Sequence, residues 1–138
     1  MFAASSVTAV RREGPTVDPS NPIVEFGMPA DPQYVRVARL VAGDMAERAG
    51  FSVDELDDVR LAVDELCAIL IGADAPLELR MQAVGGELVI QGKTAGPAPV
   101  VPSELSETLL RALVDSCTFD TSEHETSVMM RKQARDIP

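Results

Sequence analysis

The stretch DDVRLAVDELCAILIG, residues 57–72, decides the fold class and raises the question of function. Its apolar residues recur at the spacing of one helical face, which predicts an amphipathic helix. Adjacent acids, Asp64 and Glu65, interrupt the apolar run at its centre. A helix with a purely structural role rarely places two acids there, so they face either water or a site. The apolar positions of this helix are Leu56, Val59, Val63, Leu66 and Leu70.

Capping signals set the limits of two consecutive helices. Ser52 and Glu55, three residues apart, form a capping box that begins the second helix, and Gly72 ends it. Asp31 followed by Pro32 predicts the start of an earlier helix, which ends at Gly50. The expected apolar face of the earlier helix consists of Tyr34, Val37, Ala38, Val41 and Met45.

Beyond Gly72 the apolar period changes from about 3.6 residues to 2. In PLELRMQAVGGELVIQG, residues 76–92, apolar Leu77, Leu79, Met81 and Ala83 alternate with polar residues, and Gly85-Gly86 follows as a turn. This pattern predicts an antiparallel hairpin with a two-residue turn and one buried face. A further strand is expected at roughly residues 22–29, before the first helix, because Pro29 closes an apolar run there.

The C-terminal third predicts a loop, a helix and a strand. Three prolines and a glycine in KTAGPAPVVP, residues 93–102, indicate an irregular loop. SELSETLLRALVDSC, residues 103–117, returns to helical spacing, and TSVMMRKQA, residues 126–134, suits a last strand. The expected apolar face of this helix is Leu105, Leu109, Ala112 and Leu113. The order of elements favours an α+β fold, a two-layer sandwich with a mostly antiparallel sheet and helices on one face.

Length and composition indicate one domain. The chain has 138 residues, of which 46% are hydrophobic and 25% are charged, as in a globular protein. We expect a flexible N-terminal tail over residues 1–21, the domain over 22–134 and a C-terminal tail over 135–138. No apolar run has the roughly 18 to 20 residues that span a bilayer, and basic residues follow the apolar start instead of preceding it. We therefore expect a cytoplasmic protein without membrane contact.

Charge and the scarce reactive side chains exclude several functions. The net charge of −10 repels phosphate backbones, so direct binding of nucleic acid is not expected. Cys67 and Cys117 lack metal-ligand spacing and are expected to be buried, reduced thiols, although a disulfide between them stays open. His124, in the polar turn DTSEHETS, has no second histidine or cysteine nearby, which disfavours a metal site.

The strand ending in MPADP, the helix carrying Arg39 and the following LAVDE core together resemble the anti-sigma-factor serine kinases. These are small bacterial switch proteins of the GHKL superfamily, the histidine-kinase-like ATPases with a Bergerat fold, and the resemblance covers about residues 22–133. It implies a role in transcription regulation during a stress response, by partner switching between a sigma factor and its antagonist.

The resemblance also assigns roles along the second helix. The glutamate that matches Glu65 helps to activate the phosphoacceptor serine of the antagonist, as a general base. An asparagine one turn later binds the magnesium ion of ATP, but here the matching residue is Ile69, which offers no oxygen to a hard cation. Glu65 is therefore expected to be the remnant of a catalytic base, in a chain without a metal site.

Two further nucleotide motifs of the family are missing. The family has an adenine-binding aspartate at the end of a strand, yet residues 88–103 contain no acid. A glycine-rich phosphate cradle should precede the last helix, yet VVPSELSETLL has no glycine. We therefore expect no cofactor, and in particular no Mg-ATP, in a degenerate member that keeps the fold without phosphoryl transfer.

Arginines on the first helix of the family contact both the sigma factor and the antagonist. The resemblance therefore marks Arg39, with Arg36 three residues before it, as partner-binding residues. The expected function is that of an anti-sigma factor, which sequesters a sigma factor by direct contact and is released by a STAS-type anti-anti-sigma protein. Two alternatives are an active serine kinase with ATP and magnesium, and a module that only titrates the antagonist. The resemblance also allows a homodimer.

Overall fold

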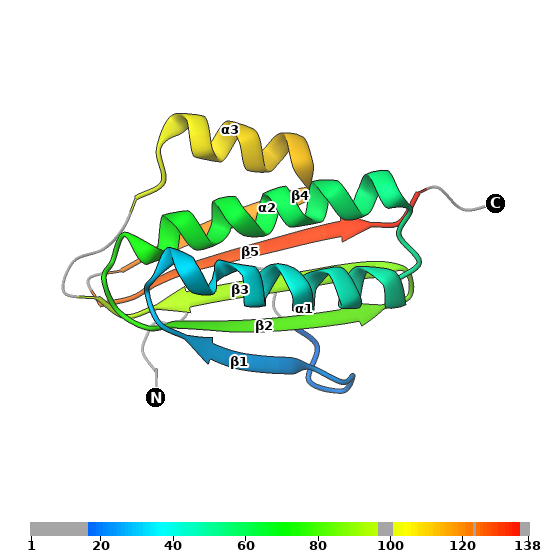
Figure 1. Ribbon diagram of the computed structural model, residues 1–138, viewed down its shortest axis with the longest axis horizontal. Helices are drawn as coiled ribbons and strands as arrows, with labels where there is room; N and C mark the ends of the chain where they lie inside the picture. Colours follow the sequence, from blue (N-terminus) through cyan, green and yellow to red (C-terminus); the bar gives the residue numbers. More distant parts are fainter. Residues whose placement is uncertain (1–16, 97–100, 123, 136–138) are drawn as a thin grey trace.

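The computed structural model describes residues 17–96, 101–122 and 124–135 as one sheet with helices on one side (Figure 1). The strands are β1 (Val24–Met28), β2 (Leu77–Val84), β3 (Glu87–Thr94), β4 (Ser116–Thr121) and β5 (Thr126–Gln133). The helices are the 3₁₀ turn η2 (Pro32–Tyr34), α1 (Val35–Arg48), α2 (Val53–Ile71) and α3 (Glu104–Leu113). The sheet order is β1-β2-β3-β5-β4, with every neighbouring pair antiparallel. The predicted α+β sandwich is confirmed.

The first two helices begin where their capping residues predict. Ser52 Oγ accepts a hydrogen bond from the Glu55 N–H at 3.2 Å, and Glu55 Oε1 accepts one from the Ser52 N–H at 2.9 Å. Both halves of the capping box are therefore formed. Asp31 caps the earlier helix by accepting from the Gln33 N–H at 3.0 Å, but its first turn is the 3₁₀ turn η2.

The predicted hairpin of β2 and β3 is formed, with its turn at Gly85-Gly86, and β3 extends beyond its predicted end. Gly85 and Gly86 have φ of 59° and 80°, values that glycine adopts without the steric cost of a side chain. The last pairs of β2 and β3 join Glu78 to Lys93 and Leu77 to Thr94. The loop predicted to begin at Lys93 was therefore placed too early, because both residues still belong to β3. Residues 97–100 of that loop lie outside the described residues.

Strand β4 was not predicted, and its sequence was assigned to a helix and a turn. The structure ends α3 at Leu113 and pairs β4 with β5 along its whole length. Cys117 consequently lies in a strand, where the sequence had suggested a helix. The error has a physical reason, since only Cys117 and Phe119 give β4 an apolar face, too short a run to show alternation.

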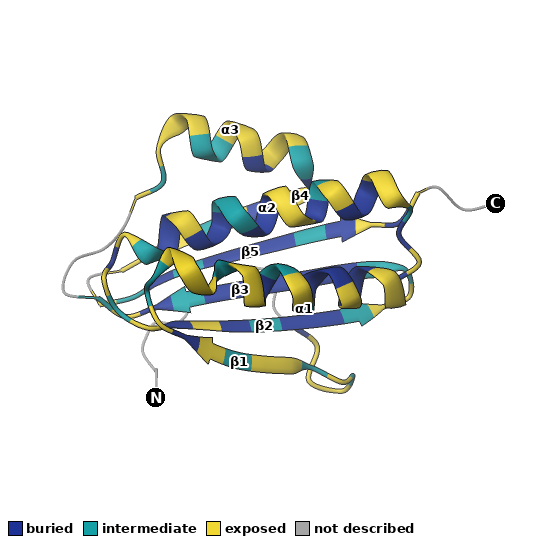
Figure 2. Cartoon of the chain, in the orientation of Figure 1, coloured by how far each residue is buried: buried dark blue, intermediate teal, exposed yellow. Residues whose placement is uncertain are grey.

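Two helices bury only part of the predicted face. On α1 Ala38 and Met45 are buried and Val41 packs against the core, as predicted, whereas Tyr34 and Val37 are each 45% exposed. On α3 Leu110 is fully buried, whereas Leu105 and Leu109 are 78% and 40% exposed. Figure 2 shows the resulting pattern, with exposed outer faces on all three helices above a mostly buried sheet. The buried residues of α1 are Ala38, Ala42, Gly43, Met45 and Ala46.

A short N-terminal segment lies against the opposite face of the sheet. Val17 is 4% exposed and clusters with Val89 and Met129. The Asp18 N–H donates to Gln82 Oε1 at 2.9 Å, so residues 17–21 of the predicted tail contact β2. Residues 1–16 and 136–138 of the predicted tails lie outside the described residues. Within the described part, no helix is long and apolar enough to cross a membrane.

Candidate partner-binding site

Asp64 and Glu65 point toward two different helices. Asp64 Oδ1 accepts from Arg39 Nη1 of α1 at 2.7 Å, and Glu65 Oε2 accepts from Ser106 Oγ of α3 at 2.6 Å. Consecutive residues of an α-helix are rotated by about 100° around its axis, so neighbours can face opposite sides. The two central acids therefore connect α2 to both of its flanking helices.

The contact between Arg39 and Asp64 lies beside a groove between α1 and α2. This groove, called the arginine groove below, has a volume of about 350 Å³. Arg36, Arg39 and Arg60 line it together with the exposed side chain of Leu40. The structure thus brings together both arginines that the sequence had marked, and it adds a third from α2. The remaining lining residues are Gly43, Asp44 and Glu47.

Arg60 is the functional candidate that the sequence analysis missed. Its Nη1 donates to Asp57 Oδ1 at 3.2 Å, and its guanidinium lies over Gly43 of α1. A Cβ added at Gly43 would lie 3.6 Å from Arg60 Nη2, which shows that the guanidinium packs next to the backbone of α1. Helical spacing could have found this residue, because Arg60 precedes Asp64 by four positions and shares its face.

The charge of the arginine groove differs from that of the chain as a whole. Helix α1 carries three arginines against two acids, in a protein with a net charge of −10. The ion pair between Arg39 and Asp64 is partly exposed, at 38% and 39%, so it orders the guanidinium more than it stabilises the fold. An ordered, accessible guanidinium next to the 65% exposed Leu40 suits a protein contact.

The two cysteines are buried and free, as predicted. Burial, with a smaller contribution from the neighbouring Asp64 carboxylate, raises the pKa of Cys67 to about 12, against an opposing effect of Arg39. Burial likewise raises the pKa of Cys117 to about 11. Because the thiolate is the reactive form, both thiols are chemically inert at neutral pH.

The residues at the positions that bind Mg-ATP in the resembled family contact other parts of this chain. Ile69 is 6% exposed and presents only hydrocarbon where the family has an amide oxygen. The carboxylate of Glu65 is held by Ser106. At the end of β3, Thr94 is 3% exposed, and its hydroxyl lies 3.2 Å from the Ala75 carbonyl and 3.1 Å from the Pro76 carbonyl. A threonine that donates to these carbonyls is not the carboxylate that would accept from an adenine amino group.

The segment after β3 lies against the end of α2. A Cβ added at Gly96 would lie 2.7 Å from the Ala73 carbonyl oxygen. No group of three or more His, Cys, Asp or Glu side chains is placed to hold a metal ion in the described residues.

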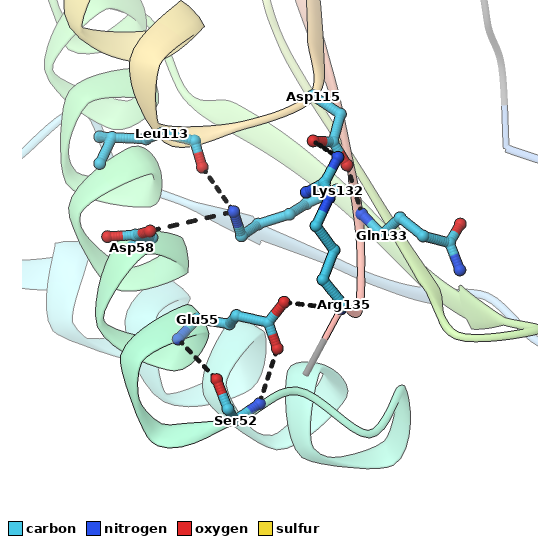
Figure 3. A network of polar contacts seen from close by, with 8 residues as sticks. All are labelled: Ser52, Glu55, Asp58, Leu113, Asp115, Lys132, Gln133 and Arg135. Atoms are coloured by element: carbon cyan, nitrogen blue, oxygen red, sulfur yellow. Dashed lines mark hydrogen bonds and ion pairs between the residues drawn. The ribbon is translucent and has the colours of Figure 1, made fainter. Parts of the chain in front are cut away.

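A polar network connects the end of β5 to the start of α2 and the end of α3 (Figure 3). Lys132 is 8% exposed and donates to the Leu113 carbonyl at 2.9 Å, with Asp58 Oδ2 at 3.9 Å. Glu55 Oε2 accepts from the Arg135 N–H at 2.8 Å. The network joins the start of α2, the end of α3 and the end of β5. Strand alternation could have placed Lys132 on the inner face, since Met130 lies there two residues earlier.

The carboxylate of Glu55 is stabilised by this arrangement. The Ser52 backbone N–H is the main cause that lowers the pKa of Glu55, against a smaller opposing effect of burial. The Arg135 backbone N–H and the positive charge of Lys132 lower this pKa further. Glu55 is therefore both the cap of α2 and its contact with β5 (Figure 3).

Comparison with known proteins gives one family and several partial relatives. Residues 28–132 match the histidine kinase-like ATPase domain. The chain is 41% identical over 44 residues to the serine-protein kinase RsbW of Bacillus subtilis and 45% identical over 42 residues to that of Oceanobacillus iheyensis. These matches cover 32% and 30% of this chain, and 28% and 27% of the two kinases, so the chain matches under a third of the length of either relative.

A solved structure shares the fold. The RsbU and RsbW domains of a Mycobacterium tuberculosis protein superpose with a TM-score of 0.65 over 86% of this chain and 35% of the other. Sequence identity in that superposition is 13%, so the likeness concerns the fold alone.

Proposed function

We propose, from the premise that this chain belongs to the histidine kinase-like ATPase domain family, that it acts as an anti-sigma factor in a partner switch. It sequesters a sigma factor by direct contact and releases it when a STAS-type antagonist binds. The likeness to the serine-protein kinases RsbW supports a regulator of this kind. The arginine groove is the single observation that carries the proposal, because it gathers three arginines beside exposed Leu40.

The groove favours a partner segment with carboxylates. Each guanidinium offers a fork of donors that matches a carboxylate, and a charge-assisted pair of this kind stabilises a complex by more than a neutral hydrogen bond. Arg39 is held in place by Asp64, so little side-chain entropy is lost when a partner binds. Sigma factor and antagonist would then compete for the same groove.

The test is binding of purified sigma factors and STAS-type proteins, one at a time, measured by calorimetry. Arg39→Glu and Arg36→Glu should each weaken binding at least tenfold, since a reversed charge leaves the partner carboxylate facing a like charge. Arg80→Glu is the control, because Arg80 pairs with Glu25 on the sheet and neither residue lines the groove. Equal losses for Arg80→Glu and Arg39→Glu would contradict the proposal.

We further propose that the switch works without ATP. The engagement of Glu65 by Ser106, the burial of Ile69 and the contacts of Thr94 with two carbonyls support this part. Glu65 then serves as a structural residue in place of a catalytic base. Titration with ATP and magnesium to several millimolar should give neither heat nor a rise in melting temperature, because only a bound ligand stabilises the native state.

The alternative is an active serine kinase, which the likeness to the serine-protein kinases RsbW favours. A saturable rise in melting temperature with Mg-ATP would establish this alternative and make Glu65 the residue to mutate. A module that only titrates the antagonist is the other alternative. It would bind STAS-type proteins while showing no affinity for any sigma factor.

A further inference from the structure

Exposed leucines gather on the outer side of α2 and α3, apart from the arginine groove. Leu105 is 78% exposed, Leu61 53% and Leu109 40%. Leu105 and Leu109 are four residues apart and therefore share one face of α3. Single exposed leucines are common on protein surfaces, but a contiguous group of them marks a contact surface.

The orientation of α3 places these leucines on the exposed side of the helical layer. Arg111 Nη1 donates to the Cys117 carbonyl of β4 at 3.1 Å, and its guanidinium carbon lies 6.0 Å from the centre of the Phe119 ring. Around the axis of α3, Leu109 is rotated by about 160° from Arg111 and Leu105 by about 120°. They consequently face away from β4.

Helix α2 contributes to the same surface. Figure 1 shows α3 running alongside α2 in the opposite direction, and the bond between Ser106 and Glu65 sets their register. Leu61 lies one turn before Glu65, and Leu109 lies almost one turn after Ser106, so the two leucines lie across from each other. We call Leu61, Leu105 and Leu109 the leucine surface. Ala68 and Ala112 of these helices are also exposed, and their short side chains do not project beyond the leucines.

The charges around the leucine surface are mostly negative. Helices α2 and α3 together carry eight acidic residues against two arginines. Asp57 and Glu104 are exposed acids of these helices. Such a setting repels anionic lipid headgroups and acidic protein segments, and it attracts cationic ones.

We propose that the leucine surface binds an amphipathic helix of a partner protein that is apolar on one face and basic at its flanks. An amphipathic helix inserts apolar side chains at i and i+3 or i+4, which matches the spacing of Leu105 and Leu109. Lysine or arginine at its flanks would lie opposite the acids of α2 and α3. The site is separate from the arginine groove, which favours an acidic segment, so the protein carries two contact surfaces of opposite charge preference.

The experiment uses a fluorescent peptide of about 18 residues, long enough to form a helix on binding, with leucines on one face and lysines on the other. Its affinity for the full chain is measured by anisotropy at about 0.15 M salt, where charge effects beyond about 8 Å are screened. The double variant Leu105→Asn with Leu109→Asn should bind about tenfold more weakly or worse, the usual loss when two anchors are removed. Hydrogen exchange should slow at residues 57–68 and 104–113 when the peptide binds.

Val53→Asn is the matched control, because Val53 is 73% exposed and belongs to neither the leucine surface nor the arginine groove. It should leave the peptide affinity within about twofold of the unchanged chain, as expected for a residue outside the contact. An equal loss in Val53→Asn, or equal binding of the same peptide with glutamate in place of lysine, would overturn the proposal. So would a dimer in sedimentation that the double variant abolishes, since a second copy would then occupy the surface. Binding of the unchanged chain to anionic phosphatidylserine vesicles, lost in the double variant, would overturn it as well.

Discussion

Gly92 lies where α2 packs on β3, and its missing side chain allows that contact. A Cβ at this position would lie 2.6 Å from Leu70 Cδ1 and 2.8 Å from Leu66 Cδ2, closer than packed atoms come. Both leucines are fully buried, so they have little room to move. The sequence showed Gly92 only as a strand residue, because the approach of α2 depends on residues far apart in the chain.

Gly92→Ala should destabilise the domain by about 1–3 kcal/mol, the usual cost of overpacking a dense core. Urea unfolding followed by circular dichroism measures the change. Gly27→Ala is the matched control in β1, where a Cβ would meet only the Leu77 carbonyl oxygen at 3.6 Å. An effect on Gly92→Ala as small as that on Gly27→Ala would show that the packing at β3 is looser than described.

Single residues also show where sequence reasoning succeeded and failed at the candidate site. Arg36 and Arg39 were marked by resemblance, and the structure places both on one groove. Arg60 was missed although its spacing from Asp64 was visible. Ser106 could not have been found, because no local pattern relates a residue of α3 to Glu65 of α2. The catalytic assignment of Glu65 stays a prediction, and its contact with Ser106 is what the sequence could not supply.

At the scale of elements, α3 buries fewer residues against the rest of the domain than α1 or α2 does. Leu110 is its one fully buried residue, and the bond between Ser106 and Glu65 is a polar contact that joins it to α2. Local openings occur preferentially where few apolar contacts are buried. The docking of α3 therefore depends on this hydrogen bond more than the docking of α1 or α2 depends on any single contact.

Ser106→Ala should accelerate amide hydrogen exchange in residues 104–113 about fivefold to tenfold, which corresponds to a lost hydrogen bond of about 1 kcal/mol. Exchange in β3 should stay unchanged. Alanine favours helix more than serine does, so faster exchange reports the loss of the Ser106 hydroxyl, which donates to Glu65 and accepts from the N-cap Ser103. Thr108→Ala, at an exposed position of α3, makes a similar change in propensity without touching Glu65. Equal acceleration in both variants would contradict a role for the Ser106 contact.

The elements differ in how well the sequence predicted them. Helices α1 and α2 and the β2–β3 hairpin were predicted because caps, turn glycines and apolar periods agree in each. Strand β4 was missed, and the buried faces of α1 and α3 were predicted only in part, correctly at Ala38, Met45 and Leu113. In α1 the alanines, not the larger Tyr34 and Val37, face the sheet, since small residues allow a close approach that hydrophobicity alone does not reveal.

At the scale of the whole molecule, carboxylates that accept backbone hydrogen bonds make stability depend on pH. The pKa of Glu55 is lowered in the folded state, chiefly by the Ser52 N–H. Burial alone raises the pKa of Asp115, but the Gln133 N–H and Arg135 outweigh it and leave the pKa lowered. A lowered folded pKa means that the stabilisation is present above the unfolded pKa, about 4, and is lost as the pH falls through the folded value.

The urea midpoint should therefore fall as the pH is reduced from about 5 to 3, through and below the unfolded pKa values of these carboxyls. Glu55→Gln should unfold at lower urea than the unchanged chain at pH 7, and its midpoint should fall less steeply with acid, because it lacks one of the protons taken up. Glu47→Gln, an exposed acid near the end of α1, should keep the original slope. Parallel slopes in Glu55→Gln and the unchanged chain would contradict the role of Glu55.

The layout of the sheet has a consequence for behaviour at high concentration. Strand β1 forms one edge and has five residues, whereas its neighbour β2 has eight. Pro22 and Pro29 stand on either side of it, and Glu25 is its second residue. A foreign strand finds few free backbone groups at such an edge and meets a charge there, so intermolecular sheet growth, the route to fibrous aggregates, is disfavoured from this side.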